Sequence, residues 1–153
     1  MAKRSLKVAV GCDPNAAELK ETIKEFLKAE GHVFEDFGSD DPIYPNVAFK
    51  VGEAVAAGKY DRGILFCGTG IGMSIAANKV PGIYAALLAD PYSAERAIKS
   101  NNTNVATLGQ QTVGTHVAKA LLKIWLDAEW EPGTRSEPKV NCIVNYAAAH
   151  VKK

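Results

Sequence analysis

Short apolar segments alternate with longer amphipathic segments along nearly the whole chain, and this alternation constrains the fold most. Five segments have the length and composition of strands, namely 7–11, 32–37, 63–67, 83–89 and 104–108. Other segments repeat apolar residues every three or four positions, which predicts helices at 16–30, 47–57, 71–79, 92–100, 113–127 and 140–151. Strands that alternate with helices favour right-handed crossovers and therefore a parallel sheet.

We therefore expect an α/β fold of three layers, with a Rossmann-like, doubly wound, five-stranded parallel sheet between two layers of helices. The segment 63–67 is apolar throughout, which indicates a strand buried on both faces. No linker or repeat interrupts the chain, so residues 1–153 are predicted to form a single domain. The last helix, at about 140–151, packs either on this domain or on a partner subunit, and the pattern leaves both alternatives open.

Composition excludes several classes of protein. The chain is 47% hydrophobic and 23% charged with a formal net charge of +1, as expected for a soluble globular protein. It has no basic run that would favour nucleic acid or a membrane surface, and no apolar stretch near the roughly 20 residues of a membrane span. The three cysteines have no metal-ligand spacing, and their odd number argues against a disulfide framework. We expect a cytoplasmic protein without a metal.

The most informative segment follows the third predicted strand. In a doubly wound sheet, ligands bind at the carboxyl ends of the strands. Gly68, Gly70 and Gly72 lie there, and such glycines allow several backbone N–H groups to turn toward one point. The helix predicted to begin near Ile71 adds the positive end of its dipole. This arrangement suits a phosphate or an enediolate oxygen, although a plain tight turn between strand and helix is an equally good interpretation of the pattern.

Cys67 directly precedes these glycines. A thiol near the N-terminus of a helix can act as a base or a nucleophile, whereas most cysteines in proteins are buried and structural. Thr69 either hydrogen-bonds a substrate oxygen or caps the helix, and Asp13, at another strand end, either orients a substrate hydroxyl or caps a helix. Arg135 and Lys139 either clamp a phosphate or begin a solvated helix.

Several of these segments together resemble a known family. The residues that carry the resemblance are 10–13, 44–45, 63–79, 91–94 and 101–105, and the stretch 67–79 is the most specific. They are similar to the sugar-phosphate isomerases that include type B ribose-5-phosphate isomerase and the galactose-6-phosphate isomerase subunits. The resemblance implies a Rossmann-like fold and a small sugar phosphate as substrate, with neither a metal nor an organic cofactor. It also implies a homodimer or homotetramer with active sites shared between subunits.

The resemblance further implies roles for individual residues. Cys67 would be the base that moves a proton between C1 and C2 of the sugar, and Thr69 would assist proton transfer to oxygen. Asp13 and Asn101 would bind substrate hydroxyls, and Arg135 and Lys139 would hold the phosphate, with Lys139 standing where arginine is usual. The remaining expected substrate-binding residues are Tyr44, Gly68, Gly70, Ile71, Gly72 and Ser100.

The chain also departs from the family pattern. Ser100 replaces a histidine linked to opening of the cyclic sugar, and Pro14, Tyr84 and Gln111 stand where a histidine and two arginines are usual. Serine is a poor acid or base at neutral pH, so the sequence favours an acyclic substrate. A tetrulose 4-phosphate cannot close a furanose ring, because its O4 carries the phosphate. The alternatives are a ribose-5-phosphate or hexose-6-phosphate isomerase with another ring-opening group, and a non-catalytic paralogue that binds sugar phosphates.

Overall fold

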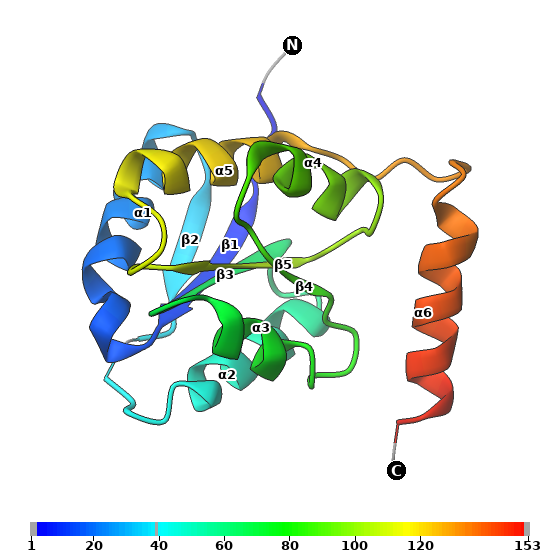
Figure 1. Cartoon of the computed structure of the whole chain (residues 1–153), viewed down its shortest axis with the longest axis horizontal. Coiled ribbons are helices and arrows are strands. Elements are labelled where there is room, and N and C mark those ends of the chain that lie inside the picture. The colour runs from blue at the N-terminus through cyan, green and yellow to red at the C-terminus, as the bar shows by residue number, and fades with distance from the viewer. Residues whose placement is uncertain (1–2, 39, 152–153) are drawn as a thin grey trace.

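The computed structural model describes residues 3–38 and 40–151, and a parallel sheet lies between two layers of helices (Figure 1). The strands are β1 (Lys7–Cys12), β2 (Val33–Asp36), β3 (Arg62–Cys67), β4 (Ala85–Leu87) and β5 (Val105–Gly109). The helices are α1 (Ala17–Ala29), α2 (Pro45–Ala56), α3 (Ile71–Ala77), α4 (Pro91–Lys99), α5 (Thr115–Asp127) and α6 (Glu137–Ala149). The predicted fold class is confirmed.

The strand order is β2-β1-β3-β5-β4, and every neighbouring pair is parallel. The chain moves outward from β1 to β2 and then returns to place β3 on the other side of β1. The direction of winding therefore reverses between β1 and β3, and their carboxyl ends form the switch point where doubly wound sheets bind ligands. Cys12 pairs with Phe66, and Cys67 pairs with Gly109, so the ends of β1, β3 and β5 lie side by side.

Each face of the sheet has its own apolar core. Helices α1, α4 and α5 cover one face, and α2 and α3 cover the other (Figure 1). Strand β3 is buried along its whole length, and its side chains alternate between the two cores. Phe66 packs in the first core, whereas Leu65 and Cys67 pack in the second. The side chain of Cys67 therefore lies on the same side of the sheet as α3.

The element boundaries differ in detail from those predicted. The fourth strand is limited to Ala85–Leu87, and the last helix begins at Glu137 instead of at 140. The earlier start has a simple reason: Pro138 lies in the first turn of α6, where a helix needs no backbone N–H. A short 3-10 turn, Pro14–Ala16, precedes α1, and Asp13 caps it.

Helix α6 stands apart from the sheet and its covering helices (Figure 1). Val140, in its first turn, is buried, but every residue from 141 to 150 is exposed. The exposed side chains include the apolar Ile143, Val144 and Tyr146. Packing on an apolar partner is what usually stabilises a helix of this length, and α6 has little of it within this chain.

The end of α5, from which the chain continues to α6, is held by a buried arginine. The guanidinium of Arg62 donates to the carbonyl oxygens of Trp125 and Ala128, and Arg4 donates to the carbonyl of Leu126 at 2.9 Å. Burial lowers the pKa of Arg62 to about 10, so it stays protonated at neutral pH. These bonds satisfy carbonyls that the last turn of a helix leaves without partners.

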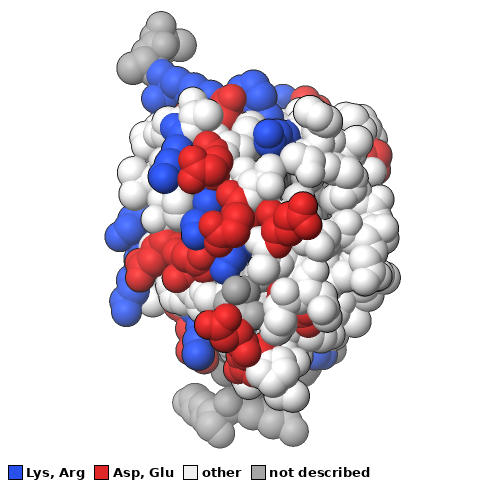
Figure 2. Space-filling model, turned by 90° about the vertical axis from the view of Figure 1, so that its left-hand side faces the viewer, with Lys and Arg blue, Asp and Glu red and all other residues white. Residues whose placement is uncertain are grey.

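The surface on the α1 side carries charges of both signs. Figure 2 shows acidic and basic side chains interspersed over the described residues of this face. Among the ion pairs of α1, Lys24 pairs with Glu21 and Asp36, and the buried Lys20 also pairs with Asp36. Among the described residues, no helix is long and apolar enough to cross a membrane.

Candidate active site

Backbone hydrogen bonds join three strand ends at the switch point. The N–H of Asp13, just after β1, donates to the carbonyl of Phe66 at 2.8 Å. The N–H of Gln110 donates to the carbonyl of Cys67 at 2.9 Å, and that of Gln111 donates to the carbonyl of Gly68 at 2.9 Å. The structure thus gathers Asp13, Cys67 and the segment after β5 at one edge of the sheet.

The thiol of Cys67 lies beneath the glycine loop, which is defined here as residues 68–72. Cys67 is 5% exposed, and its Sγ accepts a hydrogen bond from the N–H of Gly70 at 3.0 Å. Helix α3 begins at Ile71, directly after this contact. The sulfur therefore faces a backbone donor at the N-terminal end of a helix, a position that suits negative charge.

The loop needs glycine because it lies directly on the sheet. Gly70 has a φ of +81°, and a Cβ built on it would lie 2.6 Å from Leu87 Cδ1 and 2.9 Å from the carbonyl carbon of Leu108. A Cβ on Gly109, at the end of β5, would lie 2.5 Å from the backbone of Thr69. Side chains at either position would lift the loop away from the sheet.

A buried threonine also holds the loop. Thr107, on β5, is fully buried, and its Oγ1 donates to the carbonyl of Gly70 at 2.8 Å. The sequence pattern did not indicate this residue. Its only signal is a polar side chain inside an otherwise apolar strand, and that signal does not say which group the hydroxyl contacts.

Tyr44 and Gln111 flank the loop on its outer side. A Cβ built on Gly72 would overlap the hydroxyl oxygen of Tyr44, so that hydroxyl lies directly against the first turn of α3. A Cβ on Gly68 would lie 3.4 Å from the side-chain carbonyl of Gln111. The structure therefore places Tyr44 beside the glycine loop and adds Gln111 as a neighbour.

Asp13 makes the capping contact that was the alternative to substrate binding, whereas Thr69 makes a local turn contact directly before α3, whose N-cap is Gly70. The Asp13 carboxylate accepts the N–H of Asn15 at 2.8 Å, and Thr69 Oγ1 accepts the N–H of Ile71 at 3.3 Å. Thr69 is exposed and Asp13 is half-buried. Capping uses one carboxylate oxygen of Asp13, so its second oxygen and the Thr69 hydroxyl are free to face a substrate.

Ser100 and Asn101 lie near the amino ends of the strands, whereas the candidate site lies at the carboxyl ends. They end α4 and precede β5, whereas Cys67 pairs with Gly109 at the last residue of β5. A strand of five residues spans about 16 Å, and Asn101 precedes the first residue of β5, so Asn101 and Cys67 lie at opposite ends of this strand. One chain alone does not bring these residues together.

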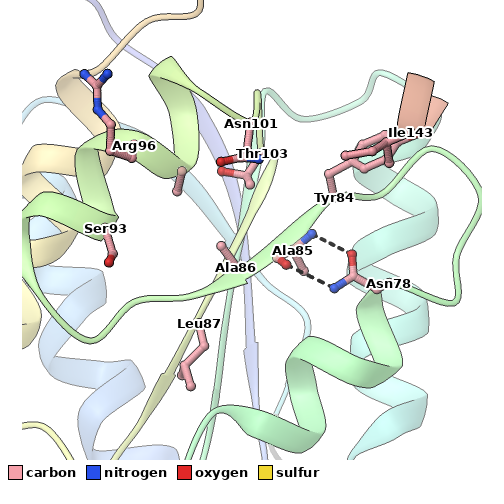
Figure 3. Close-up of a pocket in the computed structure, with 11 residues that line it drawn as sticks. Asn78, Tyr84, Ala85, Ala86, Leu87, Ser93, Arg96, Asn101, Thr103 and Ile143 are labelled. Carbon is pink, nitrogen blue, oxygen red and sulfur yellow. Dashed lines mark hydrogen bonds between the residues drawn. The ribbon is translucent and has the colours of Figure 1, made fainter. Parts of the chain in front are cut away.

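Asn101 lines a pocket of about 370 Å³ along the edge strand β4 (Figure 3). Arg96, Tyr84 and Ile143 also line it, and Ile143 is its contribution from α6. Beside the pocket, the side chain of Asn78 donates to the carbonyl of Ala85 at 3.0 Å and accepts its N–H at 2.8 Å (Figure 3). Asn78 thereby satisfies two backbone groups of an edge strand that would otherwise be open to pairing.

The expected phosphate-binding pair also lies away from Cys67. Arg135 lines a second pocket, of about 240 Å³, together with Arg96 and Lys99, and the lining includes no residue of the glycine loop. Lys139 is exposed in the first turn of α6. Within residues 3–38 and 40–151, no three His, Cys, Asp or Glu side chains are grouped so as to hold a metal ion.

A thiol that accepts a backbone N–H at the switch point of a parallel sheet is the kind of site that α/β enzymes use. Residues 8–143 match the model of the Ribose/Galactose Isomerase family, and the chain belongs to this family. The predicted resemblance is therefore confirmed, and the chain is an isomerase.

Named relatives are similar over almost their whole length. The chain is 49% identical to a D-erythrulose-4-phosphate isomerase of Pectobacterium atrosepticum, over 92% of this chain and 95% of that protein. It is 48% identical to Ribose-5-P isomerase B of Listeria innocua, over 90% and 95%. The solved structure of Ribose-5-Phosphate Isomerase B from Clostridium thermocellum superposes with a TM-score of 0.89 at 39% identity, over 95% of this chain and 99% of that one.

Proposed function

We propose that this enzyme interconverts an aldose phosphate and a ketose phosphate with Cys67 as the base. The thiolate takes a proton from the carbon beside the carbonyl, which leaves an enediolate, and returns it to the neighbouring carbon. The N–H groups of the glycine loop hold the developing oxyanion. One base and one oxyanion cradle serve the proton that moves between the carbons, and Thr69 serves the proton that moves between the two oxygens, so the proposal includes no metal or organic cofactor.

The observation that carries the proposal is the hydrogen bond from the N–H of Gly70 to Cys67 Sγ, at 3.0 Å. It shows that the sulfur lies against the backbone of the loop, and we propose that the sulfur and other backbone donors of the loop reach the same small group. A structural cysteine needs neither the adjacent run of glycines nor the start of a helix. Asp13 and Thr69, at the same edge, are the residues that we assign to a substrate hydroxyl and to proton transfer at oxygen.

Within this activity, we propose a tetrulose 4-phosphate as the substrate. The two named relatives, at 49% and 48% identity, carry different substrates in their names, so similarity alone does not choose between them. Ser100 favours the shorter sugar, because a hydroxyl is a poor acid or base for opening a furanose ring. A four-carbon 4-phosphate is already open.

Comparison of kcat/KM for D-erythrulose 4-phosphate and D-ribose 5-phosphate tests this assignment. We expect the four-carbon substrate to be preferred by at least about tenfold, which corresponds to about 1.4 kcal/mol in the transition state. The variant Ser100→His should narrow the ratio by raising turnover of ribose 5-phosphate. A clear preference of the unaltered enzyme for ribose 5-phosphate would instead support a pentose phosphate isomerase with a different ring-opening group. Absence of proton exchange with every sugar phosphate from four to six carbons would support a non-catalytic binding protein.

We further infer a homodimer or homotetramer in which each active site uses residues of two chains. Asn101, Arg135 and Lys139 lie away from Cys67 of their own chain, and a two-fold axis can bring them to Cys67 of a partner. Apolar surface for such contact is present on α6, at Ile143 and Tyr146, which we propose to pack on the partner. The Arg135 and Lys139 side chains, four residues apart, would then hold the substrate phosphate.

The cysteines also bear on the cellular compartment of the enzyme. The odd number of cysteines and the thiol chemistry proposed for Cys67 both suit a reducing compartment. We therefore propose that the enzyme is cytoplasmic.

A further inference from the structure

Thr107 makes a hydrogen bond that the packing of β5 does not require. A buried hydroxyl must be hydrogen-bonded, but a valine of the same shape would fill this position without any polar group. The carbonyl of Gly70 also has another partner, because the N–H of Ser74 donates to it at 3.1 Å as the first turn of α3 forms. The bond from Thr107 therefore adds a second constraint on the direction of this carbonyl.

That direction determines where the next N–H group points. The C=O and N–H groups of a trans peptide point in opposite directions. The carbonyl of Gly70 is directed into the sheet, toward Thr107, so the N–H of Ile71 is directed away from it, where Thr69 Oγ1 lies at 3.3 Å. The preceding N–H, that of Gly70, is directed at Cys67 Sγ.

We propose that Thr107 is a positioning residue for the oxyanion cradle. Its hydroxyl holds the peptide between Gly70 and Ile71, and so helps to keep the left-handed conformation of Gly70, with the Gly70 N–H at the thiol and the Ile71 N–H at Thr69 Oγ1. This inference rests on the proposed function, since it assigns to the cradle the role given above. Preorganised donors of this kind act mainly on the transition state, so loss of Thr107 should lower kcat more than it changes KM.

The test compares Thr107→Val with Thr107→Ser. Removal of one oxyanion donor commonly costs 100-fold or more in kcat, and a misdirected donor should cost less, so we expect Thr107→Val to lower kcat about tenfold with KM within about twofold. Thr107→Ser keeps the hydroxyl and should restore kcat to within about twofold. Thr22→Val is the matched control, because the Thr22 hydroxyl also donates to a backbone carbonyl, that of Glu18, but within α1.

Amide hydrogen exchange supplies a second measurement that needs no substrate. Exchange at Gly70 and Ile71 should become faster in Thr107→Val and should stay unchanged in Thr107→Ser, while exchange at Ile23 in α1 stays constant in both. Unchanged kcat together with unchanged exchange in Thr107→Val would overturn the inference, even if Cys67→Ser is inactive. An active Cys67→Ser would instead overturn the proposed base, and the exchange data would still decide whether Thr107 orders the loop.

Discussion

At the scale of single residues, the site depends on how closely its parts approach one another. Gly70, Gly72 and Gly109 each lack the space for a Cβ, because a leucine side chain, a tyrosine hydroxyl and the loop backbone respectively fill it. The sulfur of Cys67 contacts a backbone N–H at a distance that a shifted loop would not keep. Small steric changes in this loop should therefore affect catalysis strongly.

Gly72→Ala tests this argument, because the added methyl group would overlap the Tyr44 hydroxyl and displace the tyrosine or the first turn of α3. We expect kcat/KM to fall at least about tenfold, since a misplacement of about 1 Å near the reacting atoms can cost 100-fold. Gly114→Ala is the control, because nothing lies within 4 Å of a Cβ there. Equal kinetics for the two variants would show that close contact between Tyr44 and the loop has no catalytic importance.

The sequence pattern indicated Cys67 and the glycines as candidate site residues but not their contacts. The glycine spacing at 68, 70 and 72 indicated a loop that turns its N–H groups inward, and the hydrogen bond to Cys67 agrees with it. Thr107 could not be predicted, because its partner, Gly70, is 37 residues away in the sequence and the pairing depends on the register of β3 against β5. Nor did the spacing indicate that Tyr44 lies against Gly72.

At the scale of elements, an ion-pair cluster fastens α1 to the end of β2. The Asp36 carboxylate accepts hydrogen bonds at 2.8 Å from Lys20, from Lys24 and from the N–H of Gly38. Partial burial alone would raise the pKa of Asp36, but the hydrogen bonds from Lys20, Lys24 and Gly38 outweigh it and lower the pKa to about 2. The cluster also holds the beginning of the loop that leads to Tyr44.

This cluster predicts how stability changes in acid. The folded protein holds the proton of Asp36 less tightly than the unfolded chain, so the contribution of Asp36 is fully present above about pH 5 and is lost as the pH falls toward 2. Asp36→Asn should lower the free energy of unfolding at pH 7 and flatten its decline between pH 5 and 2, as measured by urea titration at each pH. Asp40→Asn, an exposed change nearby, should leave the profile unaltered. If both variants keep the profile of the unaltered protein, the cluster does not fasten α1 to β2.

The elements themselves were largely predictable because each one carries a local pattern. Apolar runs mark the strands, and repeats of three or four residues mark the helices. Two features required long-range information. The order of β5 before β4 in the sheet depends on how the crossovers pack, and the sequence pattern left open whether α6 packs on its own domain.

At the scale of the whole molecule, the proposed sharing of sites between subunits predicts complementation between inactive variants. Cys67→Ser and Arg135→Ala should each be inactive or nearly so as pure proteins. In a mixed dimer, one of the two sites combines the intact Cys67 of the Arg135→Ala chain with the intact Arg135 of the Cys67→Ser chain. That site should be active. Random exchange of subunits makes half of the dimers mixed, so activity should recover to about one quarter of the unaltered level.

The control for this experiment is a mixture of Cys67→Ser with Cys67→Ala, which contains no intact site in any pairing. Mass spectrometry should first show that Cys67→Ser and Arg135→Ala exchange subunits. If the mixture still has no activity, Arg135 belongs to the site of its own chain or to no site.

The central claim is that Cys67 moves the proton, and exchange of the substrate's carbon-bound hydrogen with solvent tests it most directly. In deuterium oxide, the unaltered enzyme should incorporate deuterium at the carbon beside the carbonyl of its sugar phosphate. Cys67→Ser should lower this incorporation by at least about 1,000-fold while still binding the substrate, because the hydroxyl of serine is a far weaker base than a thiolate. Incorporation by Cys67→Ser at the rate of the unaltered enzyme would contradict the mechanism.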